Sequence, residues 1–197
     1  MRIKVFTCLA VVPAILMAGM SARAAARNTS DTDWKDPAVF ERNRLPMRAA
    51  FHTDDGILSL NGVWDFKWYE DIDCRARDFY RTDFDDSSWG TMPVPGMWEL
   101  NGYGDPVYLN YYYAWHGHYE SNPPIPPVKD NHVGQYRRHF EWNDAWEKRD
   151  VFLCIGSATS NVRVWVNGKE VGYSQDSKLD ARFDIGSYLV KGDNLIA

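Results

Sequence analysis

The sequence of 197 residues has little cysteine, and this shortage excludes a disulfide-stabilised scaffold. Only three cysteines occur, and Cys8 falls within an N-terminal apolar run. Of the other two, Cys154 belongs to the apolar segment Val151–Ile155, where a small thiol suits a buried strand. We therefore expect Cys74 and Cys154 to be free, although an oxidising compartment would allow one bridge between them.

The sequence also lacks an apolar run long enough to be a clear membrane span. Residues 5–20 form the N-terminal apolar run, which is short for a bilayer and is broken by Pro13. Two basic residues precede this run and Ala22-Arg23-Ala24 follows it, an order typical of a secretory signal peptide. We expect residues 1–24 to be removed and the mature protein to be secreted, to the periplasm or the extracellular space, with no membrane span. A retained anchor is the weaker alternative.

Basic residues are scarce relative to acidic ones. The sequence has 22 Lys and Arg against 27 Asp and Glu, a formal net charge of −5. Removing Arg2, Lys4 and Arg23 with the leader lowers the basic count from 22 to 19 and the net charge to −8. Nucleic acid is excluded as a partner, because binding phosphates needs a basic patch.

No stretch shows helical periodicity over three turns, whereas apolar and polar residues alternate in residues 64–68, 136–142 and 162–166. Alternation with period two predicts half-buried β-strands. Asn167-Gly168 separates the third run from another that includes Val171. This dipeptide predicts a hairpin, because both residues accept the positive φ of a type I′ turn.

Turn residues recur between these runs, so the sequence predicts an all-β sandwich over residues 58–197. Residues 25–57 are polar and rich in arginine, and we expect them to form an extended arm. The long segment 103–133 is rich in Tyr, Pro and His without alternation, which is typical of a functional loop. The last residues resemble a turn, 191–194, followed by the first residues of another strand, 195–197. We therefore expect the last strand to be incomplete and the sequence to be a piece of a longer protein.

Five motifs follow one another in a fixed order along the chain. They are Leu60-Asn61-Gly62-Val63-Trp64-Asp65-Phe66, Val94-Pro95-Gly96-Met97-Trp98, Gly102-Tyr103-Gly104-Asp105-Pro106-Val107-Tyr108-Leu109-Asn110, Asn122-Pro123-Pro124 and Val164-Trp165-Val166-Asn167-Gly168. Their order resembles the opening domain of bacterial β-galactosidases of glycoside hydrolase family 2, and the similarity covers roughly residues 33–197. The resemblance implies a jelly-roll-like β-sandwich of the galactose-binding-domain type.

The resemblance also implies that catalysis resides elsewhere. A retaining glycosidase needs two carboxyl groups about 5 Å apart, and in this family both are glutamates on a downstream (β/α)₈ barrel. The present sequence has no Asn-Glu pair of the acid/base type and no alternation of strands and helices. Acids such as Asp85, Asp86 and Asp176 fall in turns. We expect no catalytic residue here, and no activity from this piece alone.

Asn110 is the residue to which the resemblance gives a role in binding substrate. In the family, the asparagine at this position reaches into the pocket of the barrel and hydrogen-bonds galactose hydroxyls. An amide suits this role because it donates and accepts at once. The alternative is a turn asparagine that caps its own backbone. The sequence departs from the family after Asn110, where three tyrosines replace the usual Tyr-Pro.

Two aspartates of the arm, Asp33 and Asp36, are candidate metal ligands. The resemblance implies a structural Mg²⁺ site to which the arm contributes, and Na⁺ as a second cofactor of the family. The histidines are weaker candidates, because a His-x-His on a loop without a matching third ligand is usually solvent-exposed. They are His116, His118 and His132.

Four aromatic residues, three in the long segment and one just before it, could stack on a sugar or pack in the core. They are Trp98, Tyr103, Tyr108 and Trp115.

Three functions remain open at this point. The chain is expected to be part of a retaining, secreted β-galactosidase whose partners are a β-galactoside and the downstream barrel, and a homo-oligomer is compatible with it. A stand-alone carbohydrate-binding module is the first alternative. The same domain of a β-glucuronidase or β-mannosidase is the second.

Overall fold

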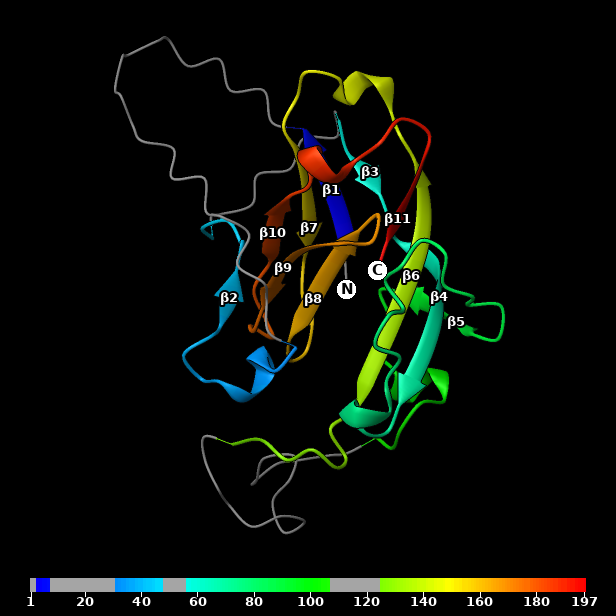
Figure 1. The fold of residues 1–197 in the computed structure, drawn as a ribbon, viewed down its shortest axis with the longest axis vertical. Helices are drawn as coiled ribbons and strands as arrows, with labels where there is room; N and C mark the ends of the chain where they lie inside the picture. Colours follow the sequence, from blue (N-terminus) through cyan, green and yellow to red (C-terminus); the bar gives the residue numbers. More distant parts are fainter. Residues whose placement is uncertain (1–2, 8–30, 48–55, 107–124) are drawn as a thin grey trace.

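The computed structural model describes residues 3–7, 31–47, 56–106 and 125–197, with residues 3–7 as backbone only (Figure 1). In this part of the chain the regular structure consists of β-strands and of 3₁₀-helices of three residues each. None of its helices is long and apolar enough to cross a membrane. The strands are β1 (Ile3–Thr7), β2 (Glu41–Arg42), β3 (Leu58–Ser59), β4 (Gly62–Tyr69), β5 (Gly90–Val94), β6 (Val133–Glu141), β7 (Val151–Ile155), β8 (Val162–Val166), β9 (Lys169–Ser174), β10 (Ala181–Asp184) and β11 (Asp193–Ile196).

The strands form two antiparallel sheets, in the orders β10-β7-β1-β3 and β2-β9-β8-β11-β6-β4-β5. Side chains from both sheets meet in one buried cluster, which includes Trp64 and Val164 from the larger sheet and Leu153 and Phe183 from the smaller. The protein is therefore an all-β sandwich, as the alternation and the missing helical period predict. Trp64 is buried in this core, and its Nε1 donates to the carbonyl of Leu60 at 2.8 Å.

The hairpin predicted at Asn167-Gly168 joins β8 to β9, and both residues have positive φ values, 50° and 77°. The Asn167 side chain also forms hydrogen bonds with residues outside the turn. Its Nδ2 donates to Tyr188 O at 2.9 Å and to Asn194 Oδ1 at 2.8 Å, and its Oδ1 accepts from Leu195 N at 2.9 Å. The turn is thereby tied to β11, the neighbouring strand of the sheet.

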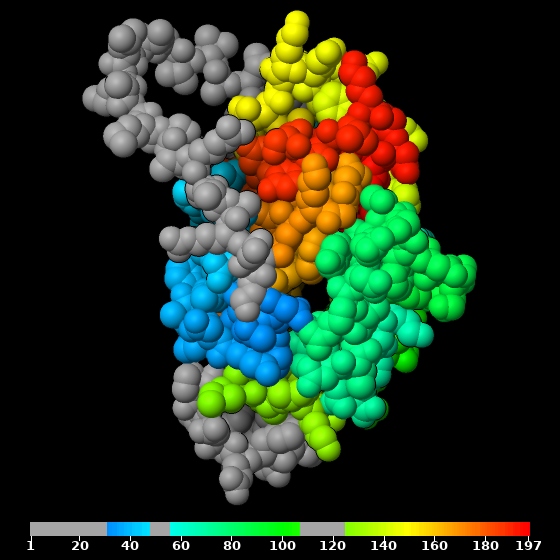
Figure 2. Space-filling view, viewed as in Figure 1, coloured from blue at the N-terminus to red at the C-terminus, as the bar shows by residue number. Residues whose placement is uncertain are grey.

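The expectation of a half-exposed strand is wrong for one position of β6. Arg137 lies on the outer face of the sheet, yet only 2% of its surface is exposed. Residues 70–89 cover this face (Figure 2). The Arg137 guanidinium donates to Asp86 Oδ2 at 2.5 Å, to Arg81 O at 2.9 Å and to Phe79 O. The partners of the buried charge come from a segment about fifty residues earlier, which alternation within β6 does not indicate.

Three further expectations concern the ends of the chain and the cysteines. β11 (Asp193–Ile196) confirms that the final residues form a strand; it lies inside the sheet, between β8 and β6, and not at an edge. β1 (Ile3–Thr7), within the predicted leader, pairs with β7 and β3. Cys154 is buried in β7 as predicted, Cys74 is exposed, and no disulfide joins the two.

Candidate functional site

The described residues on either side of segment 107–124, which contains Asn110, lie at the same end of the sandwich. The helix η3 (Glu99–Asn101) precedes this segment, and β6 follows it. At this end β4 finishes and β6 begins, with Tyr69 paired to Val133 (Figure 1). Asn110 itself lies outside the described residues, as do His116, His118, Tyr108 and Trp115. The site is therefore built from the residues that hold the two stems.

Four aromatic rings, which we call the aromatic anchor, fix the first stem to the sheet: Phe66, Trp98, Tyr103 and Tyr136. The Tyr103 ring packs edge-on against Phe66 at 4.8 Å between centroids, and Tyr136 lies 4.6 Å from Phe66 on the other strand. Trp98 Nε1 donates to the Tyr136 hydroxyl at 2.5 Å. Burial raises the pKa of Tyr136 above its ordinary value, because the ionised phenolate loses hydration. Trp98 and Tyr103, two of the candidate stacking residues, thus pack within the protein and hold the stem.

Three glycines let the stem approach the sheet. A Cβ on Gly134 would lie 2.6 Å from Trp98 Cζ2 and 2.8 Å from Phe66 Cε2, so only glycine leaves room for the anchor rings. Gly102 and Gly104 have φ values of 87° and 70°, a conformation that other residues rarely adopt. The Gly-Tyr-Gly sequence therefore turns the chain so that Tyr103 points into the anchor.

A second aromatic contact joins the far stem to the near one. The ring of His132 lies 4.9 Å from that of Trp68, and Gly104 approaches both. Trp68 Nε1 is buried and has no hydrogen-bond partner among the described residues. His132 is thus an exposed ring packed at a tilt of 59° against tryptophan. Within the described ranges no three His, Cys, Asp or Glu side chains gather as a metal site.

The two candidate metal ligands of the arm occupy different environments. Asp33 is buried, and its carboxylate accepts from Arg42 Nε at 2.8 Å, from Arg42 Nη2 at 3.0 Å and from Arg163 Nη2 at 3.1 Å. The pKa of Arg42 is raised, chiefly by its hydrogen bond to Asp33. Asp36 is exposed and accepts from the amide of Ala38 at 2.9 Å.

These contacts do not fit Mg²⁺ bound at Asp33, because two guanidinium groups already hold both carboxylate oxygens and would repel a cation. We call this arrangement the arginine clamp, formed by Asp33, Arg42 and Arg163. It ties the arm to β8, and β2 extends the sheet beside β9. A metal role for Asp33 and Asp36 stays a prediction from the sequence.

The described residues thus form an antiparallel sandwich in which aromatic packing fixes a stem at one end. Residues 57–197 match the family described as glycosyl hydrolases family 2, sugar binding domain. The chain belongs to this family, and the match covers the sandwich from β3 to β11.

Known relatives agree with this assignment. The β-galactosidase of Priestia megaterium is 42% identical over 180 residues, which cover 84% of this chain and 17% of that protein. The β-galactosidase of Streptococcus thermophilus is 41% identical over 139 residues, 71% of this chain and 14% of that protein. The chain thus spans less than a fifth of either relative. A solved β-glucuronidase from an uncultured Clostridium sp. has a TM-score of 0.50 and 20% identity, covers 76% of this chain and 23% of its own, and shows the fold.

Proposed function

We propose that the chain is the N-terminal sugar-binding part of a secreted, retaining β-galactosidase, and that it supplies one wall of the substrate pocket and no catalytic carboxylate. The observation that carries the proposal is the 41–42% identity to two β-galactosidases over most of the chain. The β-glucuronidase likeness is at the level of fold alone, so it does not favour that alternative. In this proposal the carboxylates that cleave the glycosidic bond belong to a barrel downstream.

The aromatic anchor supports a role for Asn110 as a galactose ligand. Asn110 follows Pro106, the last described residue of the stem, by four positions, so covalent geometry keeps it within about 14 Å of that residue. A ligand tethered so closely to a packed stem loses little conformational freedom when it binds sugar. The packing of Trp98 and Tyr103 would thereby serve substrate orientation, while Asn110 would hydrogen-bond hydroxyls of the galactose ring.

The test is Asn110→Ala in the full-length protein that contains this domain. Losing one hydrogen-bonding amide should cost about 1–3 kcal/mol of transition-state binding, a loss of roughly 5- to 150-fold in kcat/KM for β-galactosides. The melting temperature should stay nearly unchanged, because the side chain would serve the substrate and not the core.

Asn143→Ala is the matched control. The Asn143 side chain caps a short helix at the other end of the sandwich and accepts from Ala145 N at 2.9 Å. Removing this cap should lower stability by about 1 kcal/mol and leave the kinetics unchanged. If Asn110→Ala behaves like this control, Asn110 only caps a turn and its role in the site is refuted.

A further inference from the structure

A cavity of about 480 Å³ opens at the end of the sandwich where β6 finishes. The β6–β7 connection and the β10–β11 connection form its walls, and both lie at this end in Figure 1. β6 (Val133–Glu141) carries Tyr136 of the aromatic anchor and leads into Trp142 of the cavity, and the extended backbone between these two residues separates them by about 20 Å. The cavity is thus separate from the site to which Asn110 is assigned.

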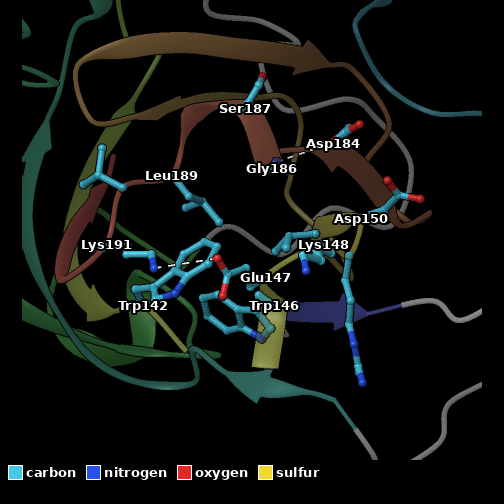
Figure 3. A pocket seen from close by; sticks show the side chains of 13 residues that line it. Trp142, Trp146, Glu147, Lys148, Asp150, Asp184, Gly186, Ser187, Leu189 and Lys191 are labelled. Atoms are coloured by element: carbon cyan, nitrogen blue, oxygen red, sulfur yellow. Dashed lines mark hydrogen bonds and ion pairs between the residues drawn. The ribbon is translucent and has the colours of Figure 1, made fainter. Parts of the chain in front are cut away.

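Two tryptophans give the cavity a fixed aromatic wall (Figure 3). Trp146 is 2% exposed, and Trp142 packs edge-on against it with 5.6 Å between ring centroids. Trp142 is only partly buried, and its Nε1 donates to Asp144 Oδ1 at 3.1 Å. Both contacts restrain the indole, and Trp142 lines the cavity with the part of its ring that stays exposed. The flat face of an indole suits the C–H side of a pyranose ring, which is apolar and equally flat.

The charged side chains around the cavity balance one another. Glu147 and Lys191 form an exposed ion pair at 3.8 Å across its edge, drawn as a dashed line in Figure 3. Three carboxylates and three cations line it in total: Glu147, Asp150, Asp184, Lys148, Arg149 and Lys191. An equal number of charges of each sign favours neither an anion nor a cation. Carboxylates and ammonium groups together offer acceptors and donors to the hydroxyl groups of a neutral ligand.

We propose that this cavity is an accessory binding site for a neutral saccharide, distinct from the substrate pocket that Asn110 would serve. The sugar ring stacks on Trp142, and its hydroxyls hydrogen-bond the Glu147 carboxylate and the Lys191 ammonium group. A second sugar site at the far end of the domain would hold a glycan chain near the enzyme, whichever sugar unit occupies the substrate pocket. This inference stands on the cavity alone and does not depend on the proposed hydrolytic function.

The experiment titrates the 197-residue chain with lactose and, in parallel, with maltose, and follows binding by calorimetry and by tryptophan fluorescence. We expect saturable binding in the millimolar range, weakened about tenfold by Trp142→Ala. Glu147→Gln and Lys191→Ala should each weaken binding several-fold, and these exposed side chains can be replaced without affecting folding. They keep the test decisive if Trp142→Ala lowers the thermal stability. Binding of maltose as well as lactose supports a general saccharide site, and binding of lactose alone supports one specific for galactosides.

Two controls use residues outside the cavity. Trp34→Ala, in the arm helix η1 (Asp33–Lys35), and Lys67→Ala, on β4, should leave the affinity unchanged. The cavity variants test this site, whereas the kinetics of Asn110→Ala in the full-length protein test the substrate-pocket proposal, so the two proposals can fail independently. The accessory site is refuted if neither sugar binds saturably. It is refuted equally if Glu147→Gln and Lys191→Ala bind as tightly as the unaltered chain.

Discussion

Replacing Asp33 by asparagine should detach the arm from the sandwich. The Asp33 side chain is 2% exposed, whereas those of its partners Arg42 and Arg163 are 25% and 13% exposed. Asparagine fits the same space but turns an NH₂ group toward guanidinium donors and loses the negative charge. Breaking a fully buried pair costs about 3–5 kcal/mol. Since the arginines keep some contact with water, we expect about 3 kcal/mol for Asp33→Asn, which would lower the melting temperature by about 6–12 °C.

Two assays check this prediction, thermal unfolding by circular dichroism and limited trypsin digestion. Trypsin should cut after Arg42 or Arg44 faster in Asp33→Asn, because the arm would leave β9 more often. Asp36→Asn is the control: Asp36 is exposed and makes one hydrogen bond to a neighbouring amide, so its effect should stay below about 0.5 kcal/mol.

The same variants separate the arginine clamp from a metal site. If Asp33 pairs with arginines alone, chelators and added Mg²⁺ should leave the melting temperature of the unaltered chain unchanged. A Mg²⁺-dependent rise that disappears in both Asp33→Asn and Asp36→Asn would refute the clamp and establish the aspartates as ligands. Equal melting temperatures and equal digestion rates for Asp33→Asn and the unaltered chain would refute the estimated energy of the clamp.

Three further variants test the anchor and the buried arginine. Gly134→Ala would force a methyl group against Trp98, and the free energy of unfolding in urea should fall by about 1–3 kcal/mol. An unchanged unfolding midpoint would contradict the tight packing. The pKa of the Tyr136 phenol is raised in the folded chain, so the unfolded chain releases this proton at a lower pH and stability should fall as the pH rises past 10.0. Tyr136→Phe should make that fall shallower. Denaturation at pH 7 and above pH 10.0 would reveal the difference. Arg137→Met would leave Asp86 and two carbonyl groups without their hydrogen-bond donor and should lower the free energy of unfolding by about 3 kcal/mol, as measured by calorimetry. A loss below about 1 kcal/mol would show that water replaces the guanidinium.

The sequence predicts local features of this fold well. Alternation locates the strands around Trp64 and Val164, and the Asn-Gly dipeptide locates the β8–β9 hairpin, because both signals depend only on neighbouring residues. The buried strand at Cys154 follows from its continuous apolar run in the same way.

Features that join distant segments could not be predicted. Arg163 meets Asp33 across 130 positions, and Arg137 meets Asp86 across 51, so each pair depends on strand order and on the path of a loop. The local spacing of apolar and polar residues indicates neither the strand order nor the path of the loop. Part of the aromatic anchor could have been found from one signal, because an isolated glycine inside a strand, here Gly134, often marks the close approach of another segment. The composition of segment 103–133 indicates a functional loop but not which rings hold it.

The hydrogen bonds of Asn167 have a consequence for the chemical lifetime of the protein. An Asn-Gly sequence is prone to spontaneous deamidation, because the glycine amide nitrogen can attack the side-chain carbonyl of the asparagine and expel ammonia. In the folded chain the Asn167 amide is held by Tyr188 O, Asn194 Oδ1 and Leu195 N, which restrains the rotation that this attack requires. A carboxylate in its place would turn an oxygen toward two oxygen acceptors and repel them. Deamidation would therefore proceed mainly from molecules whose β8–β9 hairpin has opened, and the accumulation of aspartate at position 167 would record how often that occurs during storage.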